Sequence, residues 1–133
     1  HIIFGSGISA FELEDLLIQR NFKKVLKTIS YMREQDRQSS APIIWIISKV
    51  INSCLESLKA KDKKSALIKS GVWSSKINLY LELVKQAKTK DFLKLNEEIL
   101  KIDLINKGLI NADAWEQIDS LVLKLQDATA LQT

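Results

Sequence analysis

The residues that could carry nucleophilic or metal chemistry are few in this sequence. His1 is its only histidine, and Cys54 is its only cysteine and lies within an apolar stretch. A Ser-His-Asp or Cys-His system, or a zinc site with two histidines, needs more residues of these types inside the chain. One thiol also cannot form an internal disulfide. We therefore interpret Cys54 as a small buried residue of a protein from the reducing cytoplasm.

Motifs for phosphate binding and for acid–base catalysis are missing as well. The glycine cluster Gly5-Ser6-Gly7 lacks the lysine and the hydroxyl residue of a P-loop, so it predicts a linker. Glu97 and Glu98 are neighbours on a predicted helix, where adjacent side chains do not face each other. The sequence thus predicts no catalytic residue, no metal ligand and no cofactor.

Lysines offer a different kind of chemistry, which is contact with phosphate groups. The formal net charge is +4, and we expect the excess to be spread along the chain. One group of lysines opens a predicted helix and comprises Lys23, Lys24 and Lys27. A second group lies in a predicted connector and is the candidate DNA-backbone contact: Lys59, Lys61, Lys63 and Lys64. The alternative is that both groups are ordinary solvated lysines, and no interleaved aromatic platform for stacking single strands is evident.

The elements that would position these residues are all predicted to be helices. Apolar residues recur at three- and four-residue spacing, and no stretch alternates as a strand would. The expected helices run from Ser9 to before Asn21, over 22–35, over 41–59, over a short turn at 66–70, from Ser74 or Ser75 through Ala87, from Thr89 to Gly108 and from Asp113 through Leu125. This order predicts one all-α bundle of about five to six helices over 9–133, with 1–8 as a linker or a non-native lead-in.

Helix ends and the core follow from the same pattern. Ser9 with Glu12, Thr89, and Asp113 with Glu116 are expected to cap helix starts, and Gly71 and Gly108 to end helices. On the helix of 89–107, Leu93, Leu100 and Leu104 are expected to widen the apolar stripe. The predicted core shares helical spacing and comprises Leu26, Ile29, Ile47, Ile51, Ile77, Val84, Ile99, Ile102, Ile118 and Val122.

The three tryptophans divide into two expected roles. Trp73 and Trp115 are predicted to seal the core. Trp45 lies in the run Ile43 to Ile47, where the helix is apolar on nearly every side, so Ile44, Trp45 and Ile46 are the candidate protein interface. This run is also the longest apolar one, so no segment is predicted to span a membrane.

Several motifs resemble one protein family. Residues 9–17, Ser-Ala-Phe-Glu-Leu-Glu-Asp-Leu-Leu, resemble an "F-x-L-x-D-A-L-L" opening, and 23–29 resemble an "x-R-A-L-x-I-L" second helix. The segment 71–76 contains Trp73 and Lys76 and is similar to a "V-W-x-x-[RK]" element. The segment 102–108 contains Asp103, Lys107 and Gly108 and is similar to a "D-x-x-x-K-x-G" element, which Trp115 follows. In this order, over roughly 9–126, the motifs resemble the C-terminal collar domain of the delta subunits of bacterial DNA polymerase III clamp loaders.

The resemblance implies an oligomerisation domain without catalytic activity. In that family a five-subunit machine loads the sliding clamp on primed DNA, and helical collar domains join its subunits. The resemblance implies tau/gamma-type and delta-prime-type subunits as partners. It implies sliding-clamp contact only through an N-terminal domain outside this sequence, and no membrane.

One segment departs from the family pattern. Some members carry an aromatic that can meet DNA between the "K-x-G" element and the following tryptophan, where this chain has Leu109-Ile110-Asn111. No base-stacking role is therefore expected there. Two alternatives remain at this point: an independent nucleic-acid-binding module that uses the connector lysines, and a helical scaffold unrelated to replication.

Overall fold

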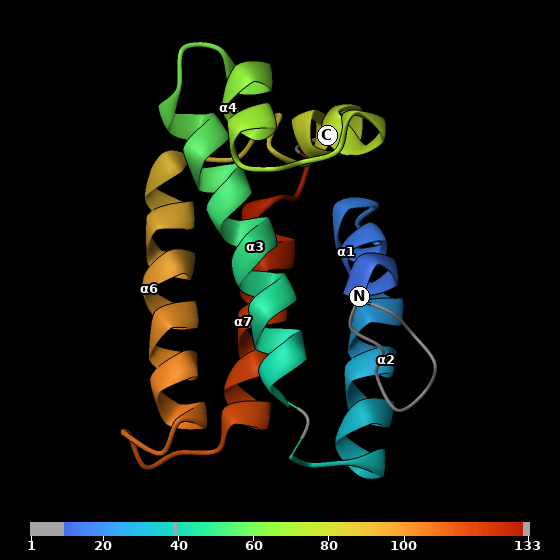
Figure 1. Ribbon diagram of the computed structural model, residues 1–133, viewed down its shortest axis with the longest axis vertical. Coiled ribbons are helices and arrows are strands. Elements are labelled where there is room, and N and C mark those ends of the chain that lie inside the picture. The colour runs from blue at the N-terminus through green and yellow to red at the C-terminus, as the bar shows by residue number, and fades with distance from the viewer. Residues whose placement is uncertain (1–9, 39, 132–133) are drawn as a thin grey trace.

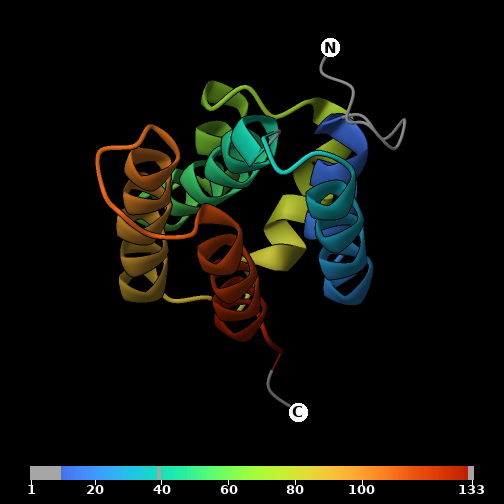
Figure 2. The ribbon, with the colours of Figure 1, turned by 90° about the horizontal axis from the view of Figure 1, so that it is seen from below.

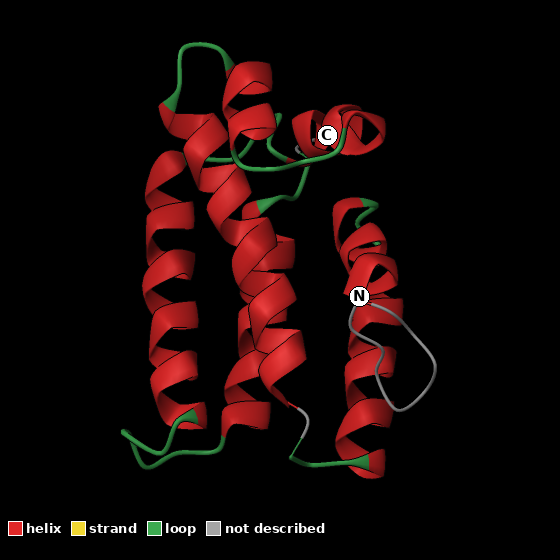
Figure 3. Cartoon of the chain, in the orientation of Figure 1, coloured by secondary structure: helices red, strands yellow, loops and turns green. Residues whose placement is uncertain are grey.

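The computed structural model describes residues 10–38 and 40–131, and within them every regular element is helical (Figures 1 and 3). The elements are α1 (Ala10–Ile18), α2 (Phe22–Gln35), α3 (Ser40–Lys59), α4 (Lys63–Lys69), the 3-10 turn η1 (Ser74–Lys76), α5 (Ile77–Leu83), α6 (Thr89–Asn106) and α7 (Ala114–Ala128). The predicted all-α class is confirmed, although the described part holds seven α-helices rather than five or six.

The central element of the bundle is α3. It packs along its length against α6 and also contacts α1, α4 and α7. α6 pairs with α7, and α7 in turn packs against α2 (Figure 1). In both views α6 and α2 lie on opposite sides of the molecule (Figures 1 and 2). The short α4 and α5 lie near the end of α3 at Lys59 (Figure 1).

The junction between α1 and α2 also determines where α5 ends. Arg20 has a left-handed backbone (φ 61°), and its guanidinium donates to the carbonyl oxygens of Glu82 at 2.7 Å and Leu83 at 3.3 Å. These carbonyls belong to the last turn of α5, where a cation is favourable. α5 therefore ends at Leu83, and the prediction of a long helix through Ala87 is wrong. Asn21, the expected end of the first helix, instead caps the start of α2.

Other helix ends agree with the sequence only in part. The Asp113 carboxylate accepts from the N–H of Trp115 at 2.9 Å, which confirms the predicted cap of α7. Gly71 (φ 88°) and Gly108 (φ 79°) follow α4 and α6 in the left-handed conformation that glycine adopts readily. Thr89 is the first residue of α6 rather than its cap. The expected cap Ser9 lies outside the described residues.

The core agrees closely with the helical pattern. Nine of the ten predicted core residues are buried, and the exception, Leu26, is half-buried at the edge of the core. Two further expectations are wrong. Trp73 is 58% exposed because the segment between α4 and η1 places it at the surface, and Leu93, Leu100 and Leu104 are exposed because none of the described helices covers that side of α6. Trp115 is buried as predicted, and its Nε1 donates to the Arg37 carbonyl at 2.7 Å.

By length and composition α3 could cross a membrane. This helix has 20 residues, and its most apolar window of 18 residues has a mean hydropathy of 1.3. Within the bundle, 56% of that window is buried. The central helix of a bundle needs this composition because neighbouring helices cover most of its surface. Packing within the bundle therefore accounts for its apolar character.

Candidate protein interface

Trp45 lies on the outer side of α3, where its ring is half exposed. Its neighbours Ile44 and Ile46 are 4% and 0% exposed. Successive residues of a helix point about 100° apart, so one side of this apolar run can face outward while the rest packs inward. Of the candidate interface residues, Trp45 therefore faces outward, and its contact with a partner stays a prediction. Ile46 belongs to the core, so its place in the candidate interface is wrong.

A groove beside Trp45 lies at the surface between α3 and α6. Its volume is about 200 Å³. The residues that line it come from both helices: Ala41, Ile44, Trp45 and Ser48 from α3, and Ile99, Leu100 and Asp103 from α6. Ile44, although almost covered, thus contributes to the floor of this groove. A groove with a large aromatic at its edge is the shape that accepts side chains of another protein.

Exposed leucines extend this surface along α6. Leu93, Leu100 and Leu104 are 46%, 56% and 40% exposed, and their spacings of seven and four place them on one face of the helix. Leu109 is 71% exposed, and its N–H donates to the carbonyl of Leu104 at 2.9 Å. We call Trp45, Leu93, Leu100, Leu104 and Leu109 the α3–α6 apolar face. Clustered apolar side chains at a surface mark interaction sites, whereas scattered ones do not.

The family-motif residues Asp103, Lys107 and Gly108 lie at the end of α6, near this face. Lys107 Nζ lies 2.6 Å from Asp103 Oδ2, an exposed pair one turn apart. Such pairs contribute only about 0.3–0.5 kcal/mol, so this one adds a charged rim more than stability. The Ser40 hydroxyl donates to Asn106 Oδ1 and ties the start of α3 to the end of α6. Gly108 then lets the chain turn back toward α7.

The other family-motif pair, Trp73 and Lys76, belongs to a separate cluster. Lys76 Nζ lies 5.3 Å from the centre of the Trp73 ring and 2.8 Å from Glu14 Oε1. The Tyr80 hydroxyl donates to Glu14 Oε2 at 2.5 Å, and Lys49 Nζ lies 3.6 Å from the same oxygen. Glu14 is 1% exposed, so this cluster is an interior ion pair that joins α1, α3, η1 and α5.

The protonation states of this cluster follow from its contacts. Burial acts to raise the pKa of Glu14, but hydrogen bonds from Lys76 and Tyr80 and the charge of Lys49 outweigh it, so that the pKa lies below its usual value. Burial and the adjacent Glu14 raise the pKa of Tyr80. The sequence did not reveal this cluster. One signal in the sequence could have indicated it. Glu14 lies next to Leu13 and one turn before Leu17 and Ile18, on the side of α1 that faces the core.

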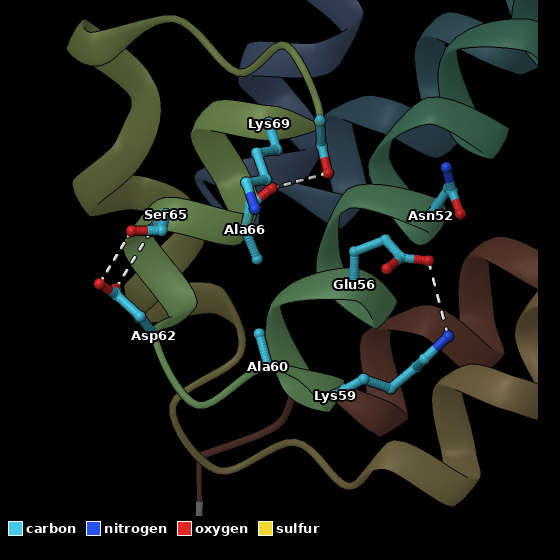
Figure 4. A pocket seen from close by; sticks show the side chains of 9 residues that line it. Asn52, Glu56, Lys59, Ala60, Asp62, Ser65, Ala66 and Lys69 are labelled. Atoms are coloured by element: carbon cyan, nitrogen blue, oxygen red, sulfur yellow. Dashed lines mark hydrogen bonds and ion pairs between the residues drawn. The ribbon is translucent and has the colours of Figure 1, made fainter.

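The connector lysines are divided among the end of α3, the loop after it and the start of α4. Lys59, Lys61, Lys63 and Lys64 are all exposed, but Lys59 alone lines the cavity between the end of α3 and α4 (Figure 4). This cavity has a volume of about 720 Å³, and its walls also carry Glu56 and Asp62. Lys59 pairs with Glu56 at 3.6 Å. Contrary to the sequence expectation, Lys63 and Lys64 belong to α4, because Asp62 caps this helix through the N–H of Ser65 at 3.1 Å.

Catalytic chemistry finds little support among the described side chains. Within residues 10–38 and 40–131 no group of three His, Cys, Asp or Glu side chains could hold a metal ion. The Cys54 thiol is fully buried, and burial raises its pKa well above the usual value. Since the thiolate is the reactive form, Cys54 is an inert core residue.

Comparisons of the chain with models of protein families, with curated proteins and with solved structures found no match.

Proposed function

We propose that this chain is the collar domain of a delta subunit of a bacterial clamp loader, and that it holds this subunit in the complex through the α3–α6 apolar face. The observation that carries the proposal is the exposure of Trp45 beside Leu100, at a groove between the two longest helices. A half-exposed tryptophan beside an apolar groove is the usual centre of a protein interface. The order of the sequence motifs supplies the choice of family.

On this proposal the chain performs no chemistry of its own. Its partners are the collar domains of tau/gamma-type or delta-prime-type subunits in the cytoplasm. The sliding clamp would be contacted by a different domain of the same subunit, and primed DNA would be met only in the assembled complex. ATP hydrolysis by the purified chain would contradict this proposal.

The test is assembly with purified clamp-loader subunits. The variants Trp45→Ala and Leu100→Ala should each weaken binding, because loss of a residue at the centre of an interface costs about 2 kcal/mol or more, or roughly 30-fold in affinity. The matched control is Leu123→Ala on α7, since Leu123 is 49% exposed and lies outside this face. It should bind as the unaltered chain does.

Two results would contradict the proposal. If the unaltered chain binds no clamp-loader subunit, the domain is a scaffold for another assembly or a nucleic-acid module. If it binds them but Trp45→Ala and Leu100→Ala leave the affinity unchanged, the interface lies on another face. Thermal melting of each variant separates a lost contact from a lost fold.

A further inference from the structure

We propose that one exposed face of α2 binds the phosphate backbone of nucleic acid. This surface, the α2 basic face, consists of Lys23, Lys24, Lys27 and Tyr31. It is not part of the α3–α6 apolar face, and the proposal does not depend on the assignment to a clamp loader. α2 and α6 lie on opposite sides of the bundle, so a partner on one face leaves the other accessible (Figures 1 and 2).

α2 is one of several basic segments that are spread along this chain. It has three lysines, one arginine and one glutamate, which gives a net charge of +3. Residues 59–64 have the same net charge of +3, but Asp62 lies among their lysines and Lys59 pairs with Glu56. The first half of α2 has no acid among its residues.

Packing of the opposite side of α2 makes the lysines point to solvent. Phe22, Val25, Ile29 and Met32 are buried. Lys23, Lys24 and Lys27 are exposed, and Tyr31 is 47% exposed one turn after Lys27. The eight steps from Lys23 to Tyr31, at about 1.5 Å each, give a stripe of about 12 Å. A stripe of this length can follow several phosphates of one strand, which are about 3.4 Å apart along the helix axis of a duplex.

None of these lysines is neutralised by a described residue. Among residues 10–38 and 40–131, Lys23, Lys24 and Lys27 form no ion pair. The arginines near the end of α2 differ, because Arg33 in its last turn and Arg37 just after it lie 3.6 and 3.5 Å from Asp113 Oδ2. These two arginines are thus paired within the fold, whereas the lysines of the α2 basic face are available to bind an external anion.

The position of two of these lysines is unfavourable for the helix itself. Lys23 and Lys24 lie in the first turn, where the helix dipole is positive and acids are preferred. That turn contains no acid, and only the Asn21 side chain caps it, through the N–H of Lys24 at 3.4 Å. These two lysines therefore do not stabilise the start of α2. Together with the dipole they produce the positive potential that attracts phosphate.

Tyr31 distinguishes nucleic acid from other polyanions. An exposed ring beside lysines can stack on a base or a sugar, which is how proteins hold single strands. A helix that lies in a membrane surface needs exposed aliphatic residues opposite its lysines. The aliphatic residues of α2 are instead buried or half-buried in the bundle. The face therefore fits a nucleic-acid backbone better than a lipid surface.

The experiment measures fluorescence anisotropy of a labelled single-stranded oligonucleotide and of its duplex, titrated with the full 133-residue chain. If three lysines contact phosphates of the duplex, raising salt from about 50 to about 200 mM should weaken binding about 40-fold. The variant Lys23→Gln/Lys24→Gln/Lys27→Gln should lose this salt dependence and most of the affinity. Tyr31→Ser should weaken single-strand binding at least about fivefold and affect the duplex less.

A matched control removes the same charge elsewhere, in Lys61→Gln/Lys63→Gln/Lys64→Gln. It should keep most of the affinity, and both triple variants should melt at or above the temperature of the unaltered chain, because all six lysines are exposed. Loss of binding in this control but not in the α2 variant would overturn the proposal in favour of the connector. So would absence of binding at low salt, or binding only to vesicles of phosphatidylserine and phosphatidylcholine that depends on the α2 lysines.

Discussion

Replacing Glu14 with glutamine tests whether the interior ion pair holds the first helix on the bundle. Glutamine has nearly the same shape but no charge, and its amide N–H groups would face the donors of Lys76 and Tyr80. Glu14 is 1% exposed and the Lys76 side chain is 12% exposed, so water cannot replace the lost partner. Lys76 would keep its ion pair with Asp15, whose Oδ1 lies 3.3 Å from its Nζ.

The magnitude follows from this burial. Removing one partner of a buried pair costs about 3–5 kcal/mol. Because Asp15 still compensates part of the Lys76 charge, we expect the lower end, about 3 kcal/mol. For a domain of this size that loss lowers the melting temperature by about 10 °C. The matched control is Glu97→Gln, since Glu97 is exposed on α6, and it should change stability by less than about 0.5 kcal/mol.

The assay is thermal unfolding followed by circular dichroism over a series of pH values. The folded-state pKa of Glu14 lies below its usual value, so its contribution is present at neutral pH. It is lost as the pH falls below about 4.3, the value in an unfolded chain, and through the lowered pKa of the folded state. The difference between Glu14→Gln and the unaltered chain should therefore shrink in acid. A melting temperature at neutral pH equal to that of the unaltered chain would refute this account.

Three further predictions concern single residues, each measured as the free energy of unfolding in urea. Trp115→Ala should cost about 3–5 kcal/mol because it removes a buried ring; a cost below 1 kcal/mol would contradict its place in the core. Trp73→Ala should cost only about 0.5–1 kcal/mol, the value of its contact with Lys76, and a loss as large as that of Trp115→Ala would show that it is buried. Gly108→Ala should cost about 1 kcal/mol from its left-handed backbone alone, since an added Cβ meets no atom within 4 Å. An unchanged stability would place Gly108 in another conformation.

Local spacing was sufficient for much of the fold. The bounds of α2, Phe22 to Gln35, agree with the prediction to the residue, and the predicted core residues Ile99 and Ile102 of α6 are buried. Gly71 and Gly108 were identified as helix ends because few other residues adopt the left-handed conformation that follows a helix. These features depend on residues a few positions apart, which one sequence displays directly.

Only the tertiary structure decided which apolar residues stay exposed. Trp73 and Trp115 are the same residue type near predicted helix starts, yet one is 58% and the other 3% exposed. Leu100 and Ile99 are adjacent on α6, but α3 and α7 cover only the side that carries Ile99. Periodicity shows which residues share a face, while burial requires a second helix against that face.

The same limit applies to charged residues far apart in sequence. Glu14 meets Lys76 and Tyr80 across more than sixty residues, and Arg20 ends α5 from a similar separation. The sequence by itself predicted most of the helices and their order. The packing of those helices decided that Trp45 faces outward, that Ile46 does not, and that the lysines of α2 have no partner among the described residues, because each of these outcomes depends on which other segment is adjacent.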